Sequence, residues 1–144
     1  MTRTPSLPLS GRPEQAALDI VIRSLTEQFG NRAVTTPGIL NSHANTLTWV
    51  APEAPDIVVF PMTTDEVVKI VKLCATHHVP IIPFGAGTSF EGHVNAPWGG
   101  VSIDTREMKR VLAVHSEDLD CVIDRKSTRL NSSHIPLSRM PSSA

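Results

Sequence analysis

Residues 55–93 read PDIVVFPMTTDEVVKIVKLCATHHVPIIPFGAGTSFEGH. Two short apolar runs rich in β-branched residues frame the first part of this stretch, at 57–60 and 79–83. Such runs predict strands, and the helical spacing of the apolar residues between them predicts a helix. A strand, a helix and a second strand joined by short connections predict a right-handed βαβ unit with a parallel pair of strands.

The helix between these strands has the clearest local signal in the chain. Thr63 is followed three residues later by Glu66, which is the pattern of a capping box. The Thr63 hydroxyl is expected to accept a hydrogen bond from the N–H of Glu66, while the Glu66 carboxylate accepts one from the N–H of Thr63. The helix is expected to end near His77 and to bury Val67, Ile70, Val71 and Cys74.

The sequence on either side of this unit predicts further elements. Residues 13–29 have apolar residues at helical spacing, including Ile20, and a glycine follows as the stop. Residues 31–55 are expected to be irregular, because Pro37-Gly38 marks a turn and later prolines oppose a helix. Additional strands are expected at 101–104, 111–114 and 119–123.

The composition excludes several functional classes. The chain has 144 residues, of which 40% are hydrophobic and 19% charged, as in an ordinary globular domain. Residues 124–144 hold four of the 13 basic and one of the 14 acidic residues, so residues 1–123 have a net charge of −4. A negatively charged body offers no basic surface for binding nucleic acid. No stretch approaches the ~20 apolar residues of a transmembrane helix. Cys74 and Cys121 lie in apolar surroundings, are expected to be buried free thiols, and form no metal-like cluster with histidine.

The loop after the second strand is the candidate site. Residues 83–93 read PFGAGTSFEGH. Gly85 and Gly87 can adopt positive φ and allow an anion to approach the backbone, and a concave array of N–H groups binds phosphate. A plain tight turn is the simpler interpretation of this loop alone. It is not a Rossmann fingerprint, because Phe90 replaces the third glycine, and it is not a Walker loop, because no lysine follows.

The order of these segments resembles the PCMH-type FAD-binding domain of the vanillyl-alcohol-oxidase class of flavoproteins. The resemblance covers about residues 43–123 and continues through Gly99-Gly100-Val101-Ser102-Ile103-Asp104 and Met108-Lys109-Arg110-Val111. It implies the N-terminal subdomain of an α+β fold and an FAD cofactor whose pyrophosphate lies on the glycine loop. The cofactor-binding residues that it implies are Pro83, Phe84, Gly85, Ala86, Gly87, Thr88, Ser89 and Gly92.

Glu91-Gly92 after the loop resembles the D-lactate dehydrogenase (cytochrome) branch of this family. The branch implies oxidation of a 2-hydroxy acid, D-lactate to pyruvate, by hydride transfer to non-covalent FAD. Cytochrome c or a quinone would accept the electrons. The enzyme would lie in the cytoplasm or peripherally at the inner membrane, and in a eukaryote it would be mitochondrial. A glycolate oxidase FAD subunit and another flavoprotein of the same fold stay open as alternatives, as does a nucleotide-binding module without catalysis.

Two histidines have open interpretations at this point. His43 matches a position in the D-lactate dehydrogenase branch, and it is either a surface residue or a residue near the flavin. His93 is either a flavin link or, as we expect, a loop residue that packs or caps nearby.

The two ends of the chain do not continue the pattern. Residues 124–134 read DRKSTRLNSSH, which resembles the in-frame translation of a widely used sequencing-library adapter, and 138–144 resemble the adapter's next constant part. A natural Ser/Arg-rich disordered tail is the alternative. We therefore interpret 1–12 as a flexible leader, 13–123 as the N-terminal part of the FAD-binding domain, and 124–144 as a non-native tail. On this interpretation the chain is truncated, contains no catalytic residues and is inactive by itself.

Overall fold

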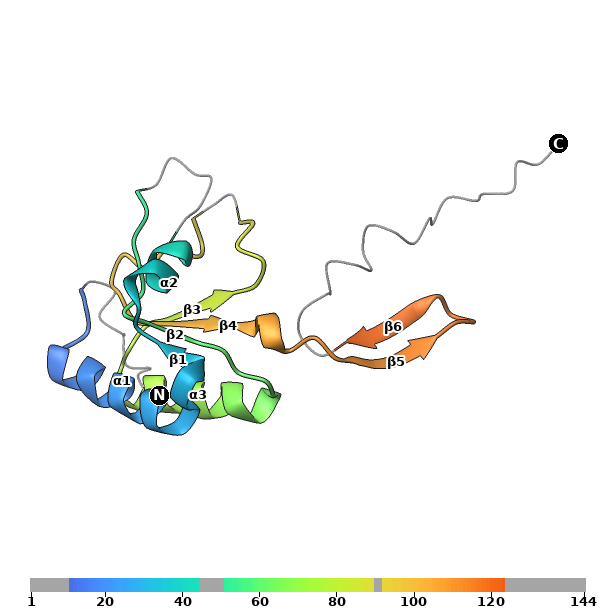
Figure 1. Ribbon diagram of the computed structural model, residues 1–144, viewed down its shortest axis with the longest axis horizontal. Coiled ribbons are helices and arrows are strands. Elements are labelled where there is room, and N and C mark those ends of the chain that lie inside the picture. The colour runs from blue at the N-terminus through green and yellow to red at the C-terminus, as the bar shows by residue number, and fades with distance from the viewer. Residues whose placement is uncertain (1–10, 45–50, 90–91, 124–144) are drawn as a thin grey trace, which may run out of the picture.

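The computed structural model describes residues 11–44, 51–89 and 92–123, so the predicted tail and most of the predicted leader lie outside the described residues. The helices are α1 (Gln15–Phe29), α2 (Pro37–Ser42) and α3 (Thr64–Thr76), with short 3₁₀ turns at Gly30–Arg32 and Thr105–Glu107. The strands are β1 (Ala33–Val34), β2 (Ile57–Val59), β3 (Ile81–Phe84), β4 (Val101–Asp104), β5 (Val111–His115) and β6 (Asp120–Ile123). Figure 1 shows a mixed body of helices and sheet, from which the β5–β6 hairpin projects. The predicted α+β class is confirmed.

The body contains a four-stranded sheet in the order β1-β2-β4-β3. β4 pairs in parallel with both β2 and β3, so the predicted parallel orientation of β2 and β3 is confirmed, whereas their predicted direct pairing is wrong. The two strands that flank α3 are not neighbours, however, because β4 lies between them. All four residues of β4 are buried, and a strand covered on both faces satisfies its backbone groups best when it is bonded along both edges.

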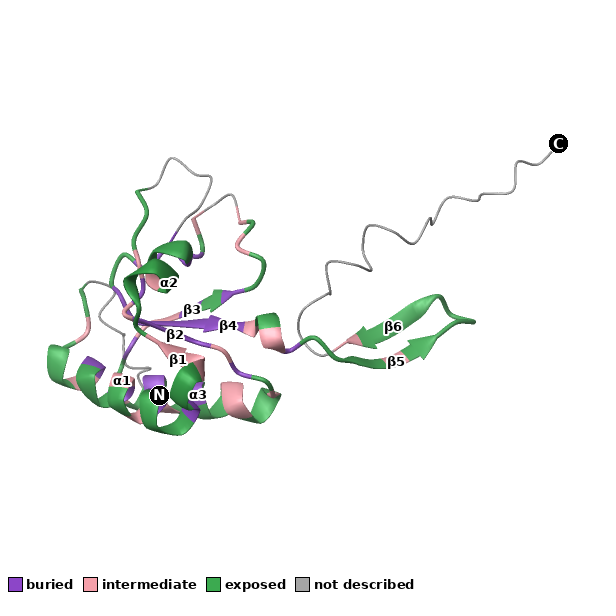
Figure 2. Ribbon diagram, viewed as in Figure 1, coloured by how far each residue is buried: buried purple, intermediate pink, exposed green. Residues whose placement is uncertain are grey.

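Helices α1 and α3 cover one face of this sheet, and α2 lies over the other (Figure 1). The main core lies between the sheet and the two long helices, and Figure 2 shows the buried stretches of β2 and β4 at its centre. Burial of one large aliphatic side chain contributes roughly 1.5–3 kcal/mol. The core consists of Leu18, Val21, Leu25, Phe29, Ile57, Val59, Ile70, Cys74, Val79, Val101 and Ile103.

Two residues expected on the buried helix stripes are on the surface. Ile20 is 45% exposed and Val71 is 40% exposed. Each is the sequence neighbour of a fully buried residue, Val21 and Ile70 respectively. Consecutive residues are about 100° apart around a helix, so a stripe centred on one neighbour turns the other toward solvent.

The region expected to be irregular contains α2. Thr36 precedes this six-residue helix with an extended conformation, and Pro37 occupies its first position. Proline is well suited to this position, because its fixed φ matches the helix and its missing N–H would have had no partner there. The Pro-Gly pair therefore begins a helix instead of a turn.

The capping box of α3 is present and extends to a residue outside the helix. The N–H of Glu66 donates to the Thr63 hydroxyl over 3.2 Å. The Glu66 carboxylate accepts the N–H of Met62 over 2.6 Å and binds both terminal nitrogens of the Arg32 guanidinium at 2.8 Å each. The hydrogen bonds from Arg32 are the main reason that the pKa of Glu66 falls from 4.5 to about 2, and the backbone N–H groups of Met62 and Thr63 add to this effect.

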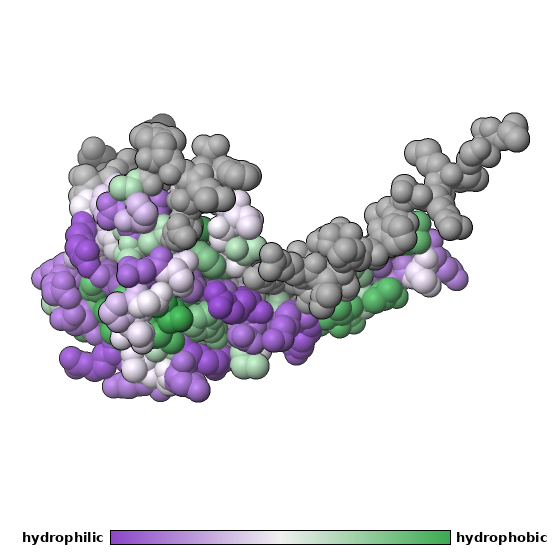
Figure 3. Space-filling model, turned by 45° about the horizontal axis from the view of Figure 1, so that its top comes forward, coloured by the Kyte–Doolittle hydropathy of each residue, from purple (hydrophilic) through white to green (hydrophobic). Residues whose placement is uncertain are grey.

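The β5–β6 hairpin has a different character from the body. Its large apolar side chains are exposed, and Figure 3 shows hydrophobic residues gathered along it. Cys121 lies on β6 and is exposed, so the prediction that both cysteines are buried is wrong for Cys121 and correct for Cys74. Residues of an isolated two-stranded ribbon have only one partner strand and no covering layer, so an apolar run there is not necessarily buried. In the described part of the chain, no helix is long and apolar enough to span a membrane.

Candidate functional site

The glycine loop lies at the carboxyl edge of the sheet. Pro83 and Phe84 are the last residues of β3, and residues 85–89 leave the sheet directly after them. The carboxyl ends of the parallel strands β2 and β4 lie at the same edge, which is where open sheets with parallel strands bind their ligands.

The backbone of this loop requires glycine at two of the predicted positions. Gly87 has φ = 69° and Gly92 has φ = 73°, both in the left-handed region that favours glycine. Gly85, which was expected to share this property, is not among the residues with positive φ. A Cβ atom at Gly87 would lie 2.8 Å from Cζ of the Phe84 ring, whereas one at Gly85 would meet no atom within 4 Å. Gly87 therefore has both a conformational and a steric reason to be glycine.

The loop presents a set of free backbone donors. The N–H groups of Ala86, Gly87 and Thr88 make no hydrogen bond to any residue in the described ranges. Ala86 and Thr88 are exposed, and Gly87 is half-buried. Consecutive N–H groups around a residue with positive φ form a concave nest, which is a binding site for anions. These observations fit a phosphate or diphosphate group.

Ser89, at the end of the described loop, contacts His93. The Ser89 hydroxyl lies 2.8 Å from Nδ1 of His93, and the His93 ring is exposed. This contact agrees with the expectation that His93 packs or caps within the loop. Residues 90 and 91, between the two, lie outside the described ranges.

A buried polar cluster lies beside the loop, and it includes His43. This residue is 1% exposed, so the interpretation of His43 as a surface residue is wrong. Its Nε2 lies 2.9 Å from Oδ2 of Asp104, which is fully buried at the end of β4. Arg106 binds the same carboxylate through Nε at 2.7 Å and through its backbone N–H at 2.8 Å.

Hydrogen bonds stabilise the charged form of Asp104 in this cluster. Burial raises the pKa of Asp104, but the bonds from His43 and Arg106 outweigh this effect and hold the pKa below its usual value. Nδ1 of His43 lies 2.8 Å from the carbonyl oxygen of Ile39, so both ring nitrogens face acceptors.

Asp104 and Arg106 have no role that the sequence alone predicts. The available signal was an acidic residue in the last position of an otherwise uncharged buried strand, since a buried carboxylate requires partners. Its partner His43 is 61 residues away in the chain, and no spacing rule connects the two.

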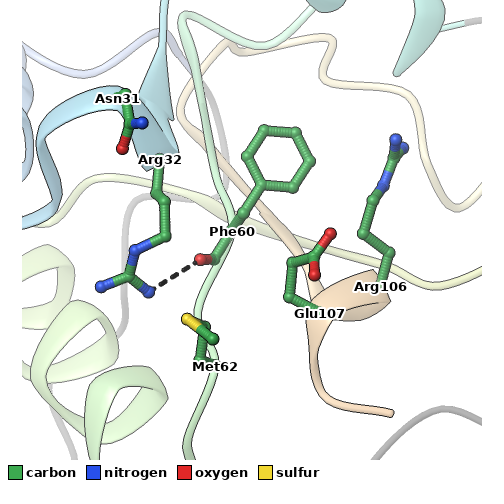
Figure 4. Close-up of a pocket in the computed structure, with 6 residues that line it drawn as sticks. All are labelled: Asn31, Arg32, Phe60, Met62, Arg106 and Glu107. Carbon is green, nitrogen blue, oxygen red and sulfur yellow. Dashed lines mark hydrogen bonds between the residues drawn. The ribbon is translucent and has the colours of Figure 1, made fainter.

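A cleft of about 320 Å³ lies where β2 ends, next to this cluster. Figure 4 shows Arg32 and Arg106 on either side of Phe60, with Arg32 donating to the Phe60 carbonyl oxygen over 3.1 Å. Both guanidinium groups already bind carboxylates, Arg32 that of Glu66 and Arg106 that of Asp104. The cleft therefore offers little uncompensated charge to an anion. No group of three or more His, Cys, Asp or Glu side chains among the described residues is arranged to hold a metal ion.

The sheet and its glycine loop define a flavoprotein domain. Residues 55–124 match the model of the family described as FAD binding domain. This stretch is an FAD binding domain of that family, and the N–H groups of Ala86, Gly87 and Thr88, which have no partner among the described residues, fit the diphosphate of FAD. None of the comparisons tests the assignment of individual cofactor-binding residues, which stays a prediction.

The chain is also similar to particular proteins. The mitochondrial D-lactate dehydrogenase (cytochrome) of Arabidopsis thaliana is 53% identical over 74 residues, which are 51% of this chain and 13% of that protein. The probable mitochondrial D-lactate dehydrogenase of Danio rerio is 37% identical over 115 residues, 79% of this chain and 23% of that protein. The solved structure of an alkyldihydroxyacetonephosphate synthase matches with a TM-score of 0.66 and 26% identity, over 83% of this chain and 25% of that one. The chain thus spans between 13% and 23% of the length of these two curated relatives.

Proposed function

We propose that this chain holds the diphosphate of FAD in an enzyme that oxidises D-2-hydroxy acids, with D-lactate as the substrate. The main support is the loop after β3, where the N–H groups of Ala86, Gly87 and Thr88 have no partner among the described residues. The resemblance of the sequence to D-lactate dehydrogenases supports the choice of substrate. When bound, FAD supplies the two-electron redox chemistry and accepts the hydride from the α-carbon of the hydroxy acid.

The residues of this chain contribute binding and orientation in this proposal. The backbone of residues 85–88 holds the diphosphate, and Pro83 and Phe84 fix where the loop leaves the sheet. The hydroxyls of Thr88 and Ser89 add donors, and Gly92 allows the chain to turn back beside the loop. A hydrogen bond to a charged group contributes about 1.5–3 kcal/mol. The electron acceptor is a cytochrome c or a quinone, and the name of the Arabidopsis relative, which mentions a cytochrome, supports an acceptor of the first kind.

Binding is tested by titrating the chain with FAD, ADP and riboflavin while the amide resonances of residues 85–89 are followed by NMR. FAD and ADP contain the diphosphate and should shift these resonances, whereas riboflavin should not. Gly87→Val should abolish the response, because it places a branched side chain where the backbone must approach the ligand. Thr88→Ala should weaken binding less, because it removes one hydrogen bond. An unchanged response of the Gly87→Val protein would show that the loop is only a turn.

The reaction is tested with the gene product that carries this chain. D-lactate, L-lactate and glycolate are supplied in parallel, with cytochrome c or a quinone analogue as acceptor, and reduction of the bound flavin is followed by absorbance. Faster reduction by D-lactate than by the other two acids is the expected result. Preference for glycolate would assign the chain to a glycolate oxidase instead. Diphosphate binding without flavin reduction by any hydroxy acid would contradict the proposed reaction but not the proposed binding site.

A further inference from the structure

The cluster of His43, Asp104 and Arg106 is linked to the glycine loop by a continuous series of contacts. Asp104 and Phe84 are register partners on neighbouring parallel strands, so their side chains lie on the same face of the sheet. The ring of His43 packs on that of Phe84, with centroids 4.2 Å apart, and its Nε2 contacts Asp104. His43 therefore joins the side chains at the ends of β3 and β4.

The same Phe84 ring supports the loop. Its Cζ lies only 2.8 Å from the position that a Cβ atom of residue 87 would have. The ring is 7% exposed, and the Thr105 hydroxyl lies 3.4 Å from the Phe84 carbonyl oxygen. Movement of the ring would change the surface on which Gly87 rests. The conformation of Gly87 in turn orients the free N–H groups on either side of it.

The position of His43 is fixed at both ends of its ring. It caps the C-terminal end of α2, and its Nδ1 lies 2.8 Å from the Ile39 carbonyl oxygen. At the other end, Arg106 holds the Asp104 carboxylate through its side chain and its backbone N–H. The guanidinium of Arg106 also lies over the Phe60 ring, 5.1 Å from its centroid. The cluster thus ties α2, β2 and β4 to the base of the loop.

A buried carboxylate such as that of Asp104 is not explained by stability alone. The cost of removing its charge from water can cancel the attraction to its partners, and an apolar replacement of equal volume is often as stable. Directional hydrogen bonds hold the side chains that make them in one defined position. Here the side chain that receives a defined position through His43 is Phe84.

We propose that His43 is a positioning residue: held by Asp104, it fixes the Phe84 ring and thereby keeps the Gly87 backbone ready to bind a diphosphate. This inference rests on the proposed function of the loop. Preorganisation of a binding loop increases affinity by reducing the cost of ordering it. Loss of the contact should therefore weaken diphosphate binding without removing any group that touches the ligand.

The test uses the full chain with ADP as the probe and compares three variants. His43→Phe keeps a ring against Phe84 but removes the contact of His43 with Asp104, and we expect an affinity loss of about tenfold together with altered amide shifts of Gly87 and Thr88. His43→Gln retains an N–H donor that reaches toward Asp104, and it should restore part of the affinity. Glu66→Gln is the matched control, because it breaks an ion pair of the same body, and the hydrogen bonds of Glu66 among the described residues are to Arg32, Met62 and Thr63 and not to the His43 cluster or the loop.

Thermal unfolding separates positioning from general stability. His43→Phe and Glu66→Gln are both expected to lower the unfolding temperature, but only His43→Phe should change ADP affinity. Equal ADP affinity in the wild-type and His43→Phe chains would overturn the inference. If His43→Phe fails to fold, Phe84→Leu replaces it, since it removes the ring on which Gly87 rests and should have the same effect. The amide shifts of Gly87 are also compared between wild type and variant without ligand, and unaltered shifts would overturn the inference. This comparison can be made even if the wild-type chain binds no ADP. Absence of ADP binding by wild type would contradict the proposed function.

Discussion

Gly87 and Phe84 are in direct contact across the first turn of the glycine loop, with the Phe84 ring occupying the place of a side chain at position 87. The contact makes Gly87 more constrained than Gly85, since its φ of 69° adds a backbone requirement to the steric one. Gly85, two residues earlier, has neither restriction. The two glycines of the Gly-Ala-Gly sequence therefore differ in what a substitution should cost.

Gly87→Ala should lower the free energy of unfolding, and Gly85→Ala should not. The left-handed conformation at position 87 costs a residue with a Cβ atom about 1–2 kcal/mol, and displacement of the Phe84 ring adds to this. Urea denaturation followed by circular dichroism measures both variants. A Gly85→Ala chain that is destabilised as much as Gly87→Ala would contradict this explanation.

Removal of the Arg32–Glu66 ion pair should change how stability depends on pH. The pKa of Glu66 in the folded chain is about 2, below its ordinary value of 4.5. The stabilisation is therefore fully present above about pH 4.5 and is lost as the pH falls through about 2. The two side chains are 29% and 24% exposed, so we expect Glu66→Gln to cost only about 1 kcal/mol at neutral pH.

Urea midpoints measured between pH 2 and pH 7 test this expectation for Glu66. The difference between wild type and Glu66→Gln should shrink as the pH falls. Glu107→Gln is the control, because Glu107 forms an exposed pair with Lys109 and should contribute little. A difference that stays constant across this range would show that the Glu66 carboxylate acts by something other than its charge.

The two cysteines should differ strongly in their reaction with a thiol reagent. Burial raises the pKa of Cys74 to about 11, and the side chain is inaccessible in the core. Cys121 is exposed on β6. A maleimide at neutral pH should therefore modify Cys121 in the folded chain and Cys74 only after unfolding, as mass spectrometry of the digested protein would show. Rapid modification of Cys74 in a Cys121→Ser chain under native conditions would contradict the described core.

Apolar residues of equal size should contribute unequally to stability in the body and in the hairpin. Leu25 is fully buried in α1, whereas Leu112 on β5 is 57% exposed. Leu25→Ala should cost about 2–5 kcal/mol, and Leu112→Ala should change the free energy of unfolding by less than about 0.5 kcal/mol. Denaturant titration of the two variants measures the contrast. A large cost for Leu112→Ala would mean that the hairpin packs against another surface in solution.

The local elements were predictable because their signals are short in range. The β-branched run of β2, the Thr63 cap and the spacing of Ile70 and Cys74 predicted β2 and α3. Each depends on residues within one or two turns of each other, where chain geometry limits the outcomes. Gly30, with φ = 56°, likewise ends α1 as expected. The glycine loop was identifiable for the same reason, as a run of small residues directly after a strand.

The sequence by itself determined the sites of the long helices and main strands, the capping of α3 and the loop that we propose binds FAD. Tertiary structure alone decided that β4 lies between β2 and β3, since strand order depends on which strand can be buried on both faces. It also decided the pairing of His43 with Asp104 and the place of the Phe84 ring beneath Gly87. These contacts join segments whose separation along the chain carries no periodic signal, and they form only when the sheet brings the carboxyl ends of its parallel strands to one edge.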